Sequence, residues 1–556
     1  MLSNPKDKDS MKYDNIERAN ILQQQFTSVF TREPEGELPT IDKKTDIEIH
    51  NLLISTDMVL KELMNLKVSK SCGPDELHPR LLTELCNHLA EPIALIFNTS
   101  MRDGRLPYDW KRAFISPIFK KGSKHLAENY RPISLTSILC KIIKHLMGEK
   151  LLSTKQYGFI NGRSTTTQLL YYLDNCMKTI VDGGVIDTIY LDFCKAFDTV
   201  PHRRLVHKLE AYGIKGQILS WITAFLQDRS QEVVVNGDRS SAASVISGIP
   251  QGTVLGPVLF VIYINDLLDK IDSEGLMFAD DTKIFHHISS YDDSLLLQND
   301  IESLEDWASK WLLSFHPDKC HVLTIGKFEN IQHAHRYEIC GNEIEHVFDE
   351  KDLGVTLDGE LRFDEHVTRK VRVANAIVGQ IRRSFSYLDC NSFRRLYTAF
   401  VRPHLEYAQA VWSPHLRKQV NILENVQIRA TKLVNGLGNL DYQERLKRLK
   451  LPTLVYRRRR GDMIEIYKHF HVYDRDSISS SFQPTTRPSR QHDFQLYVRT
   501  PRDGAMGIET NSFYQRTVRT WNNLPSSVVD AKCINSFKNK LDEHWKNDPV
   551  KYEYTY

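Results

Sequence analysis

Residues 276–285, LMFADDTKIF, place two adjacent aspartates inside a run of apolar residues. Met277 and Ile284 flank the pair, so the stretch predicts a β-hairpin whose turn carries Asp280 and Asp281. Adjacent carboxylates repel each other, and holding them at an apolar turn costs free energy unless a cation lies between them. Mg²⁺ is the natural cation, because it prefers oxygen ligands and keeps coordination positions open for phosphates. The stretch therefore predicts a metal-binding turn between two buried strands.

A second acidic pair provides an internal comparison. Asp292 and Asp293 also follow an aromatic residue, in SSYDDSLLLQND, but serines precede them and a helical pattern follows. That context is typical of a helix N-terminus, where acids are solvated caps. The metal site is therefore assigned to Asp280 and Asp281.

A third carboxylate is expected from another strand, because two-metal sites gather acids from separate segments. YLDFCKAFDTVPH (190–202) supplies Asp192 at the end of the predicted strand IYLDF, on the opposite face from Ile189 and Leu191. Asp198 is the rival, but it lies past the strand, where it is expected to cap the next helix. Each acid alone is compatible with a structural role, and the strand context of all three favours a shared site.

The composition excludes several classes of protein. The N-terminal residues MLSNPKDKDS contain no apolar core, so they show no secretory signal. The longest apolar run, VLFVIYI (258–264), is far shorter than the ~18–20 residues of a membrane span. The nine cysteines form no CxxC pair, so neither a structural zinc site nor a disulfide framework is expected. We expect a nuclear or cytoplasmic protein that is not secreted and contacts no membrane.

The charge is unevenly distributed. Residues 361–470 contain 22 Lys and Arg against 9 Asp and Glu, a local excess of +13, although the whole chain carries only +3. A basic region beside an acidic one suggests that one part follows a polyanion while the other performs carboxylate chemistry. The alternative is a set of solvated helical faces.

The chain divides into stretches with different patterns. Residues 1–110 are polar with helical spacing, and strands and helices alternate up to about residue 360. In this part a helix is expected at 136–152, and Asn236-Gly237 predicts a hairpin turn. Residues 361–470 are largely helical and basic, and 471–556 are mixed.

A series of motifs follows the chain in order. The first are KSCGPDELHPRLL, ISPIFKKG, ENYRPISL and QYGFINGRST, followed by YLDFCKAFDTVPH, SGIPQGTVLGPVLF and FADD. HPDKCHVLTIGK and KDLGVTL come next, and FVRPHLEYAQAVWSPH and VYRRRRGDMIEIYK lie further on. Together they resemble the reverse transcriptase of non-LTR retrotransposons, most closely the jockey-like LINE group. The resemblance covers roughly residues 15–545.

The resemblance implies an α+β right-hand polymerase. Residues 1–110 would be a helical N-terminal extension, 111–360 the fingers and palm, 361–470 a basic helical thumb and 471–556 a mixed C-terminal region. The activity would be that of an RNA-directed DNA polymerase, which extends a DNA primer on an RNA template with dNTPs. Two Mg²⁺ ions, with Mn²⁺ as a substitute, would be held by Asp192, the Phe193 carbonyl, Asp280 and Asp281.

The resemblance also implies a nucleotide site. Phe197 matches the aromatic residue that excludes a ribose 2′-hydroxyl, with a core position as the alternative explanation of the ring. Gln251, in SGIPQG, would contact the nascent base pair or the template. The triphosphate contacts would come from Lys120, Lys121 and Arg131, and Lys319 would protonate the departing pyrophosphate, although each could be a surface charge.

Primer and template contacts are expected further along the chain. Leu353-Gly354-Val355 fits the hairpin that grips the primer, centred on Gly354. Five basic residues are expected to follow phosphates without reading sequence: Arg369, Lys370, Arg372, Arg382 and Arg383.

One departure from the complete element affects the interpretation. No endonuclease precedes the polymerase motifs and no Cys/His knuckle follows them, so the sequence suggests a truncated copy. A catalytically inactive, nucleic-acid-binding remnant is therefore the alternative, although the intact acids favour an enzyme. An RNA-dependent RNA polymerase is disfavoured by Phe197, because such an enzyme prefers a polar residue there.

Overall fold

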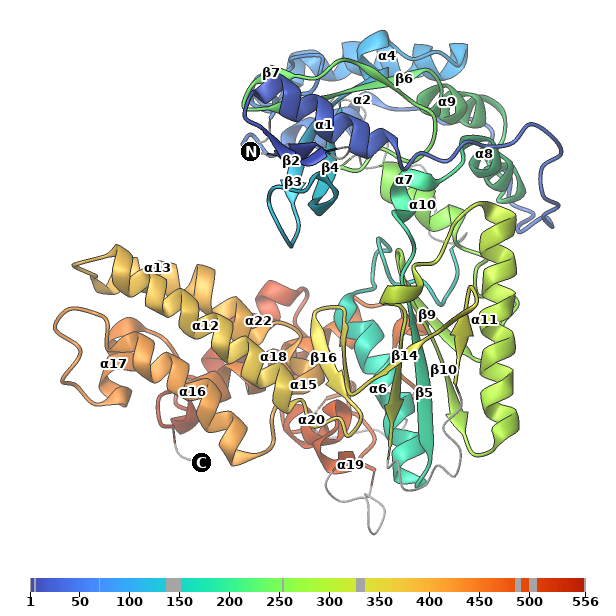
Figure 1. Cartoon of the computed structure of the whole chain (residues 1–556). Helices are drawn as coiled ribbons and strands as arrows, with labels where there is room; N and C mark the ends of the chain where they lie inside the picture. Colours follow the sequence, from blue (N-terminus) through green and yellow to red (C-terminus); the bar gives the residue numbers. More distant parts are fainter. Residues whose placement is uncertain are drawn as a thin grey trace.

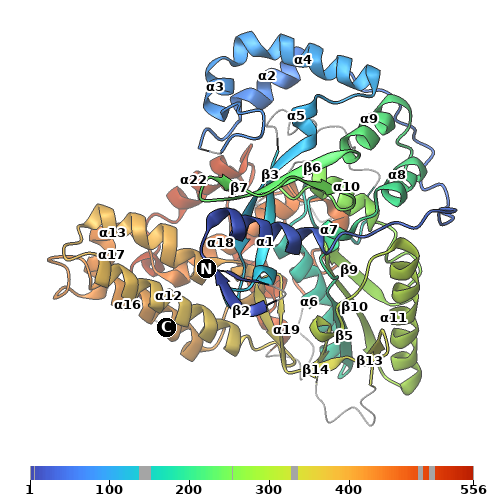
Figure 2. The same cartoon turned by 45° about the horizontal axis from the view of Figure 1, so that its top comes forward.

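The computed structural model describes residues 2–4, 7–69, 71–136, 152–252, 255–326, 336–485, 492–499 and 508–554. Figures 1 and 2 show three parts, which we call the finger lobe, the palm sheet and the thumb lobe. The finger lobe lies above the palm sheet in Figure 1, and the helical thumb lobe lies beside that sheet. The helix expected at 136–152 lies almost wholly outside the described residues.

The palm sheet has five strands in the order β14-β11-β5-β10-β9. Its middle strand, β5, pairs antiparallel with β10 and β11, and β14 runs parallel to β11 at one edge. β9 and β10 form the hairpin that the sequence predicts around the two aspartates. The strands are β5 (Val185–Leu191), β9 (Glu274–Phe278), β10 (Asp281–Ile288), β11 (His321–Ile325) and β14 (Glu345–Val347).

The two faces of the palm sheet are covered by different helices. Ile186 belongs to the core cluster that includes α6 (Thr165–Val181), whereas Ile189 belongs to the cluster that includes α11 (Tyr291–Trp311). Because side chains alternate along a strand, Asp192, which follows β5, falls on the α6 side. This is the face that the sequence predicts for Asp192.

The second acidic pair lies where the sequence places it, at the start of α11. Ser290 caps this helix, and its Oγ accepts a hydrogen bond from the Asp293 amide. The Asp293 carboxylate in turn accepts from the Ser290 amide at 2.8 Å, which completes a capping box. Asp292 is exposed, so the expected helix cap is confirmed.

The finger lobe is built on a second sheet, in the order β4-β3-β6-β7, with β8 paired to β6. The turn at Asn236 and Gly237 joins β6 to β7 with φ of 52° and 96°, and so confirms the predicted hairpin. The helix α1 (Asn15–Thr27) packs on β6. The strands are β3 (Arg112–Phe119), β4 (Tyr130–Leu135), β6 (Arg229–Val235), β7 (Asp238–Arg239) and β8 (Ala243–Val245).

The helices before residue 111 share a hydrophobic core with helices of the palm and fingers. Phe97 of α4 (Cys86–Asp103) lies 5.1 Å from the ring of Trp110, and Trp221 donates a hydrogen bond to Ser100 at 3.0 Å. Residues 54–110 are therefore packed into the finger lobe. The other helices are α2 (Thr56–Met64), α3 (Pro79–Glu84), α5 (Tyr108–Lys111), α8 (His202–Ala211), α9 (Gly216–Leu226) and α10 (Leu255–Tyr263).

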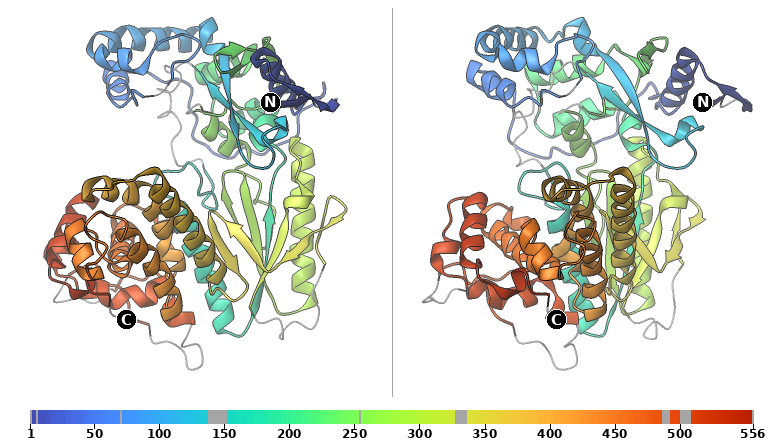
Figure 3. Two further views of the ribbon diagram at one scale, coloured as in Figure 1. Left: turned by 60° about the vertical axis from the view of Figure 1, so that its left-hand side comes forward. Right: turned by 90° about the vertical axis from the view of Figure 1, so that its left-hand side faces the viewer.

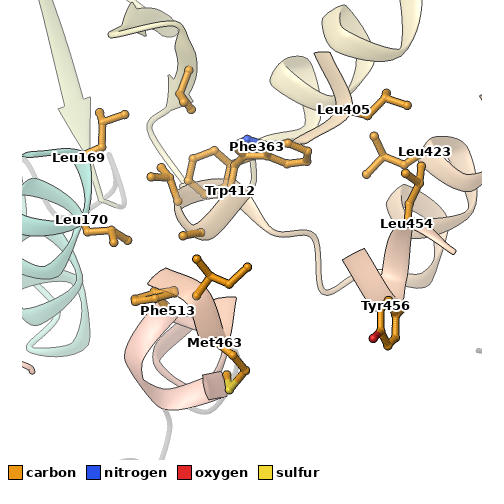
Figure 4. Packing of buried hydrophobic residues seen from close by; sticks show 14 of the residues in the cluster. Leu169, Leu170, Phe363, Leu405, Trp412, Leu423, Leu454, Tyr456, Met463 and Phe513 are labelled. Carbon is orange, nitrogen blue, oxygen red and sulfur yellow. The ribbon is translucent and has the colours of Figure 1, made fainter. Parts of the chain in front are cut away.

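The thumb lobe is almost entirely helical and packs against α6 of the palm. Figure 4 shows Leu169 and Leu170 of α6 close to Trp412 and Phe513 of the thumb lobe. The region after residue 471 belongs to the same core, because the rings of Phe470 and Trp521 stack at 5.6 Å. The main helices are α12 (Asp364–Ser384), α13 (Cys390–Leu396), α14 (Arg402–Glu406), α15 (Gln409–Trp412), α16 (Arg417–Thr431), α17 (Tyr442–Leu449), α18 (Leu454–His471), α19 (Ile508–Asn511), α20 (Phe513–Asn522), α21 (Ser526–Val529) and α22 (Ile534–His544).

No helix among the described residues combines the length and the apolar character that a membrane crossing requires.

Candidate active site

The turn between β9 and β10 carries the paired aspartates at one end of the palm sheet. Asp281 pairs with Phe278 in the hairpin, so Ala279 and Asp280 form the turn itself, and Ala279 has a φ of 56°. Asp280 is half-buried, whereas Asp281 is exposed at the wall of a small cavity. The tight turn therefore holds both carboxylates at the end of the strand pair.

Asp192 approaches the same point from β5. The ladder between β5 and β10 ends with Leu191 opposite Thr282, so Asp192 continues the register opposite Asp281. Both line a cavity of about 180 Å³. The carbonyl of Asp192 accepts a hydrogen bond from the His316 amide at 2.8 Å, which fixes the backbone here.

The carboxylates disturb each other's ionisation. The pKa of Asp281 is raised to about 6, first by loss of hydration and then by the charges of Asp280, Asp352 and Asp192. Burial raises the pKa of Asp280, and the charge of Asp192 adds to that rise. A cation bound here would relieve the repulsion, so the donor set fits a hard divalent ion. Among the described residues, no group of three or more His, Cys, Asp or Glu side chains is spaced to hold a metal ion.

Phe193 follows Asp192 in the sequence, and its side chain packs in the hydrophobic core. Its ring stacks on Phe315 with centroids 4.5 Å apart, and the two residues form an isolated antiparallel bridge. Lys319 follows in the same segment, and its Nζ lies 3.4 Å from Asp192 Oδ2. The structure therefore brings the expected metal ligand and the expected proton donor to neighbouring positions.

A buried ion pair that the sequence reasoning missed lies beneath the acids. Lys283 is 3% exposed and pairs with Asp352, which is 6% exposed, and the Lys283 ammonium lies 4.4 Å from the centre of the Tyr172 ring. Lys283 is two residues after Asp281 and therefore shares its face of β10. Period-two spacing in DDTKIF was the signal that could have identified it.

Asp352 belongs to the hairpin that carries Gly354. This hairpin joins β15 (Asp349–Asp352) to β16 (Val355–Asp358), and Gly354 has a φ of 87°. The Tyr407 hydroxyl of the thumb lobe donates to the Leu353 carbonyl at 2.8 Å. The ion pair and this hydrogen bond thus connect β10 to the thumb lobe through one short hairpin.

Phe197 and Gln251 lie on the finger side of the site. The half-buried ring of Phe197 stacks on Phe260 of α10 with centroids 4.1 Å apart. The Gln251 Nε2 donates to Asp198 Oδ1 at 2.8 Å. Gly248 approaches this segment so closely that a Cβ there would lie 2.6 Å from the Asp198 carbonyl oxygen. The SGIPQG loop therefore packs directly on the segment that carries Phe197.

The expectation that Asp198 caps the following helix is wrong. Asp198 lies inside α7 (Ala196–Thr199), and the N-cap of α8 is Pro201. Its carboxylate accepts the Gln251 amide instead, and burial raises its pKa to about 6. The physical reason is a long-range contact, because the SGIPQG loop supplies a donor 53 residues away.

The β3–β4 hairpin brings positive charge to the acids. In Figures 1 and 3 it extends from the finger lobe toward the palm sheet. The pKa of Lys120 is lowered first by burial and then by the charges of Arg131 and Lys319, and Asp192 opposes this effect. Lys121 adds a smaller repulsion. The four cations therefore lie near one another and near the carboxylates.

The residues of this site fall within one known domain. Residues 118–373 match the family described as reverse transcriptase (RNA-dependent DNA polymerase). Residues 118–373 therefore form a reverse transcriptase domain, and the chain is similar to RNA-directed DNA polymerases of non-LTR retrotransposons. The predicted α+β right-hand fold class is confirmed.

Several retrotransposon proteins are similar over most of the chain. The RNA-directed DNA polymerase from mobile element jockey of Drosophila melanogaster is 27% identical over 452 residues, which cover 75% of this chain and 48% of that protein. The probable RNA-directed DNA polymerase from transposon BS of the same species is 25% identical over 449 residues, which cover 75% and 49%. The chain thus spans about half the length of these curated relatives.

A solved structure of apo telomerase from Candida tropicalis, truncated from its C-terminal domain, also matches. The TM-score is 0.32 at 12% identity, covering 48% of this chain and 59% of that one. A likeness at this level carries no argument about the fold.

The thumb lobe presents basic residues in two settings. Arg369 is held in ion pairs with Glu365 and Asp349, both at 2.8 Å, and Lys370 lies 5.9 Å from the Tyr407 ring. Three other arginines of α12 are exposed and make no ion pair within the described residues. We call them the unpaired thumb arginines: Arg372, Arg382 and Arg383.

Proposed function

We propose that this chain is an RNA-directed DNA polymerase that extends a DNA primer on an RNA template by two-metal nucleotidyl transfer. One observation carries the proposal: in a reverse transcriptase domain, Asp281 lies beside Asp280 and Asp192, and loss of hydration together with the charges of Asp280, Asp352 and Asp192 raises its pKa to about 6. Repulsion between these carboxylates costs free energy unless cations bind at the site.

The residues that would hold the ions are the three carboxylates and the Phe193 carbonyl. Two Mg²⁺ ions bound there would activate the primer 3′-hydroxyl and neutralise charge on the triphosphate, and Mn²⁺ could replace them. Asp192 and Asp281 approach from two paired strands, so one sheet fixes their separation. Asp280 lies in the turn itself and reaches the site from the hairpin end.

The cations of the β3–β4 hairpin would bind the incoming triphosphate. The charges of Lys120 and Arg131 act on Asp280, and Lys121 repels Lys120. Their mutual repulsion is relieved when phosphate oxygens lie among them. Lys319, 3.4 Å from Asp192, is placed to give a proton to the departing pyrophosphate. Acidic and basic groups therefore have separate tasks on either side of the same substrate.

Phe197 would select the sugar and Gln251 would support the base pair. The stacking of Phe197 on Phe260 leaves the ring little freedom to move away from a ribose 2′-hydroxyl. The hydrogen bond to Asp198 restricts the Gln251 side chain in the same way. Both contacts restrict side chains that would line a pocket for a deoxynucleotide.

The primer and template would lie between the palm and the thumb lobe. Gly354 places a tight backbone turn beside Tyr407, which suits a close approach to the primer. The unpaired thumb arginines would bind phosphates, together with Arg369 and Lys370. We place the activity in the nucleus or cytoplasm, since all eight described cysteines are free, as in a reducing compartment.

Primer extension by the purified protein tests this proposal. On an RNA template with Mg²⁺ and dNTPs we expect products of full template length, and much less product with rNTPs. A protein that binds the primer–template but adds no nucleotide with either Mg²⁺ or Mn²⁺ would instead support the inactive remnant. Preferred use of rNTPs would support an RNA polymerase.

A further inference from the structure

Residues 153–163 support the catalytic turn through hydrogen bonds to its backbone. The Met277 amide donates to the Lys155 carbonyl at 2.9 Å, and the Tyr157 amide donates to the Met277 carbonyl at 2.8 Å. Between them, the Gln156 Oε1 accepts from the Ala279 amide at 2.9 Å. The segment therefore lies alongside β9 and binds the backbone of the FADD turn directly.

Gln156 has the properties of a group that holds this turn in place. Ala279 adopts a left-handed conformation that is unfavourable for a residue with a Cβ, so the turn benefits from an external contact. Gln156 is fully buried, and its Nε2 has no hydrogen-bond partner in the described structure. Burying an unpaired amide is costly, so the useful atom of Gln156 is its oxygen. That oxygen also accepts the Gly158 amide at 2.7 Å.

Gly158 lies so close to the catalytic turn that a residue with a side chain would not fit at this position. A Cβ at Gly158 would lie 2.4 Å from the Ala279 nitrogen. The segment and the catalytic turn are therefore in backbone contact, so a displacement of one is passed to the other.

Arg163 fixes the segment to the C-terminal region. Its Nη1 donates to the carbonyls of Thr154 at 2.6 Å and Gln156 at 2.7 Å. Its Nη2 donates to Asp474 Oδ2 at 2.7 Å, and the Arg163 side chain is only 5% exposed. The Asp474 amide also donates to the Gly162 carbonyl at 3.0 Å. One arginine thus joins the loop beneath the catalytic turn to the chain that follows α18.

We propose that the C-terminal region positions the catalytic turn through the contacts from Asp474 to Arg163 and from Gln156 to Ala279. The three polar side chains are positioning residues, because none of them contacts the reacting atoms. The inference rests on the proposed function, and it gives the region after residue 471 a role in catalysis that is separate from nucleic-acid binding. The segment leads into α6, which shares a hydrophobic core with the thumb lobe (Figure 4).

The test compares Asp474→Ala with Asp542→Ala. The control removes an ion pair of similar exposure, in which the Arg460 Nη2 donates to Asp542 at 2.7 Å. Among the described residues, no hydrogen bond or ion pair links Arg460 or Asp542 to residues 153–163 or to the palm sheet. We expect Asp474→Ala to lower kcat by about tenfold or more, because small displacements of catalytic groups are costly. Its primer–template Kd should stay within about twofold of wild type, since phosphate contacts lie elsewhere.

Two further variants separate positioning from general stability. Asp474→Glu keeps the carboxylate and should restore most of the rate, whereas Gln156→Met keeps the volume but removes the acceptor and should reproduce the loss. Mn²⁺ binding, followed by electron paramagnetic resonance, gives a readout that needs no turnover. Asp474→Ala should weaken this binding and Asp542→Ala should not.

The inference is overturned if Asp474→Ala behaves like Asp542→Ala in both kcat and Mn²⁺ binding. It is also overturned if the whole loss appears in the primer–template Kd. A wild-type protein that extends no primer but binds Mn²⁺ in an Asp474-dependent manner would refute the proposed function and leave the positioning role intact.

Discussion

Replacing Lys283 with methionine should destabilise β10, although the two side chains are similar in size. Lys283 and Asp352 are 3% and 6% exposed, so Lys283→Met leaves the Asp352 carboxylate buried without its partner. Breaking one side of a buried pair costs about 3–5 kcal/mol. An exposed pair such as Lys215 with Glu48, 41% and 33% exposed, contributes much less, because water and salt screen the two charges. The contrast between these two pairs is the measurable quantity.

Hydrogen–deuterium exchange measures this cost locally, which suits a chain of this size better than global unfolding. A loss of about 3 kcal/mol corresponds to amide exchange roughly a hundredfold faster in β10 and β15. The control Lys215→Met should change exchange by less than about tenfold. Restoring neutrality with Lys283→Met and Asp352→Leu together should recover much of the protection, because no buried charge then remains unpaired.

The reasoning is refuted if β10 exchanges as slowly in Lys283→Met as in the Lys215→Met control. It is also refuted if the double variant shows the sum of the two single losses, since the side chains would then act independently.

Three other outcomes are expected. Because the pKa of Asp281 is raised to about 6, protons compete with metal ions for this carboxylate. The extension rate should therefore rise between about pH 5 and 7, and excess Mg²⁺ should move this rise to lower pH. A pH-independent rate would contradict this. Phe197→Val should raise rNTP use relative to dNTPs while dNTP extension persists, and an unchanged ratio would return the ring to a core role. Exchanging the unpaired thumb arginines for Gln should flatten the dependence of log Kd on log salt by about 0.7–0.9 per lost phosphate contact. Arg369→Gln should change this slope less, because Arg369 is already ion-paired. Equal slopes for the wild type and both variants would contradict the assignment.

The pH prediction has a counterpart in stability. Asp281 has a folded-state pKa above its ordinary value, so the folded state binds more protons than the unfolded state between the two values. Its contribution to stability is therefore fully present below about pH 4 and is lost as the pH rises through about 6. Because Asp281 is exposed, solvent screening keeps this contribution small.

Local patterns in the sequence were sufficient to predict several elements. Alternation placed β5 and put Asp192 on the correct face, and the apolar residues around FADD predicted the β9–β10 hairpin. The serines before Asp292 identified the start of α11, and Asn236-Gly237 identified the β6–β7 turn. These features depend on neighbours within a few residues, which is why the sequence reveals them.

Contacts between distant segments could not be predicted in the same way. Lys283 meets a partner 69 residues away, and Gln156 reaches Ala279 across 123 residues. The error at Asp198 has the same origin, because its partner lies in the SGIPQG loop rather than in the next helix. The roles of the site residues in binding and catalysis stay predictions, since geometry alone does not measure them.

The most direct measurement of the central claim is the single-turnover rate of dNTP addition on an RNA template by two matched variants. Asp280→Asn removes a carboxylate charge from the catalytic turn, and Asp292→Asn removes the same charge from the exposed start of α11. The account predicts that Asp280→Asn lowers the rate by about three orders of magnitude or more, while Asp292→Asn stays within about twofold of wild type. Equal rates for the two variants would contradict the assignment of catalysis to the FADD turn.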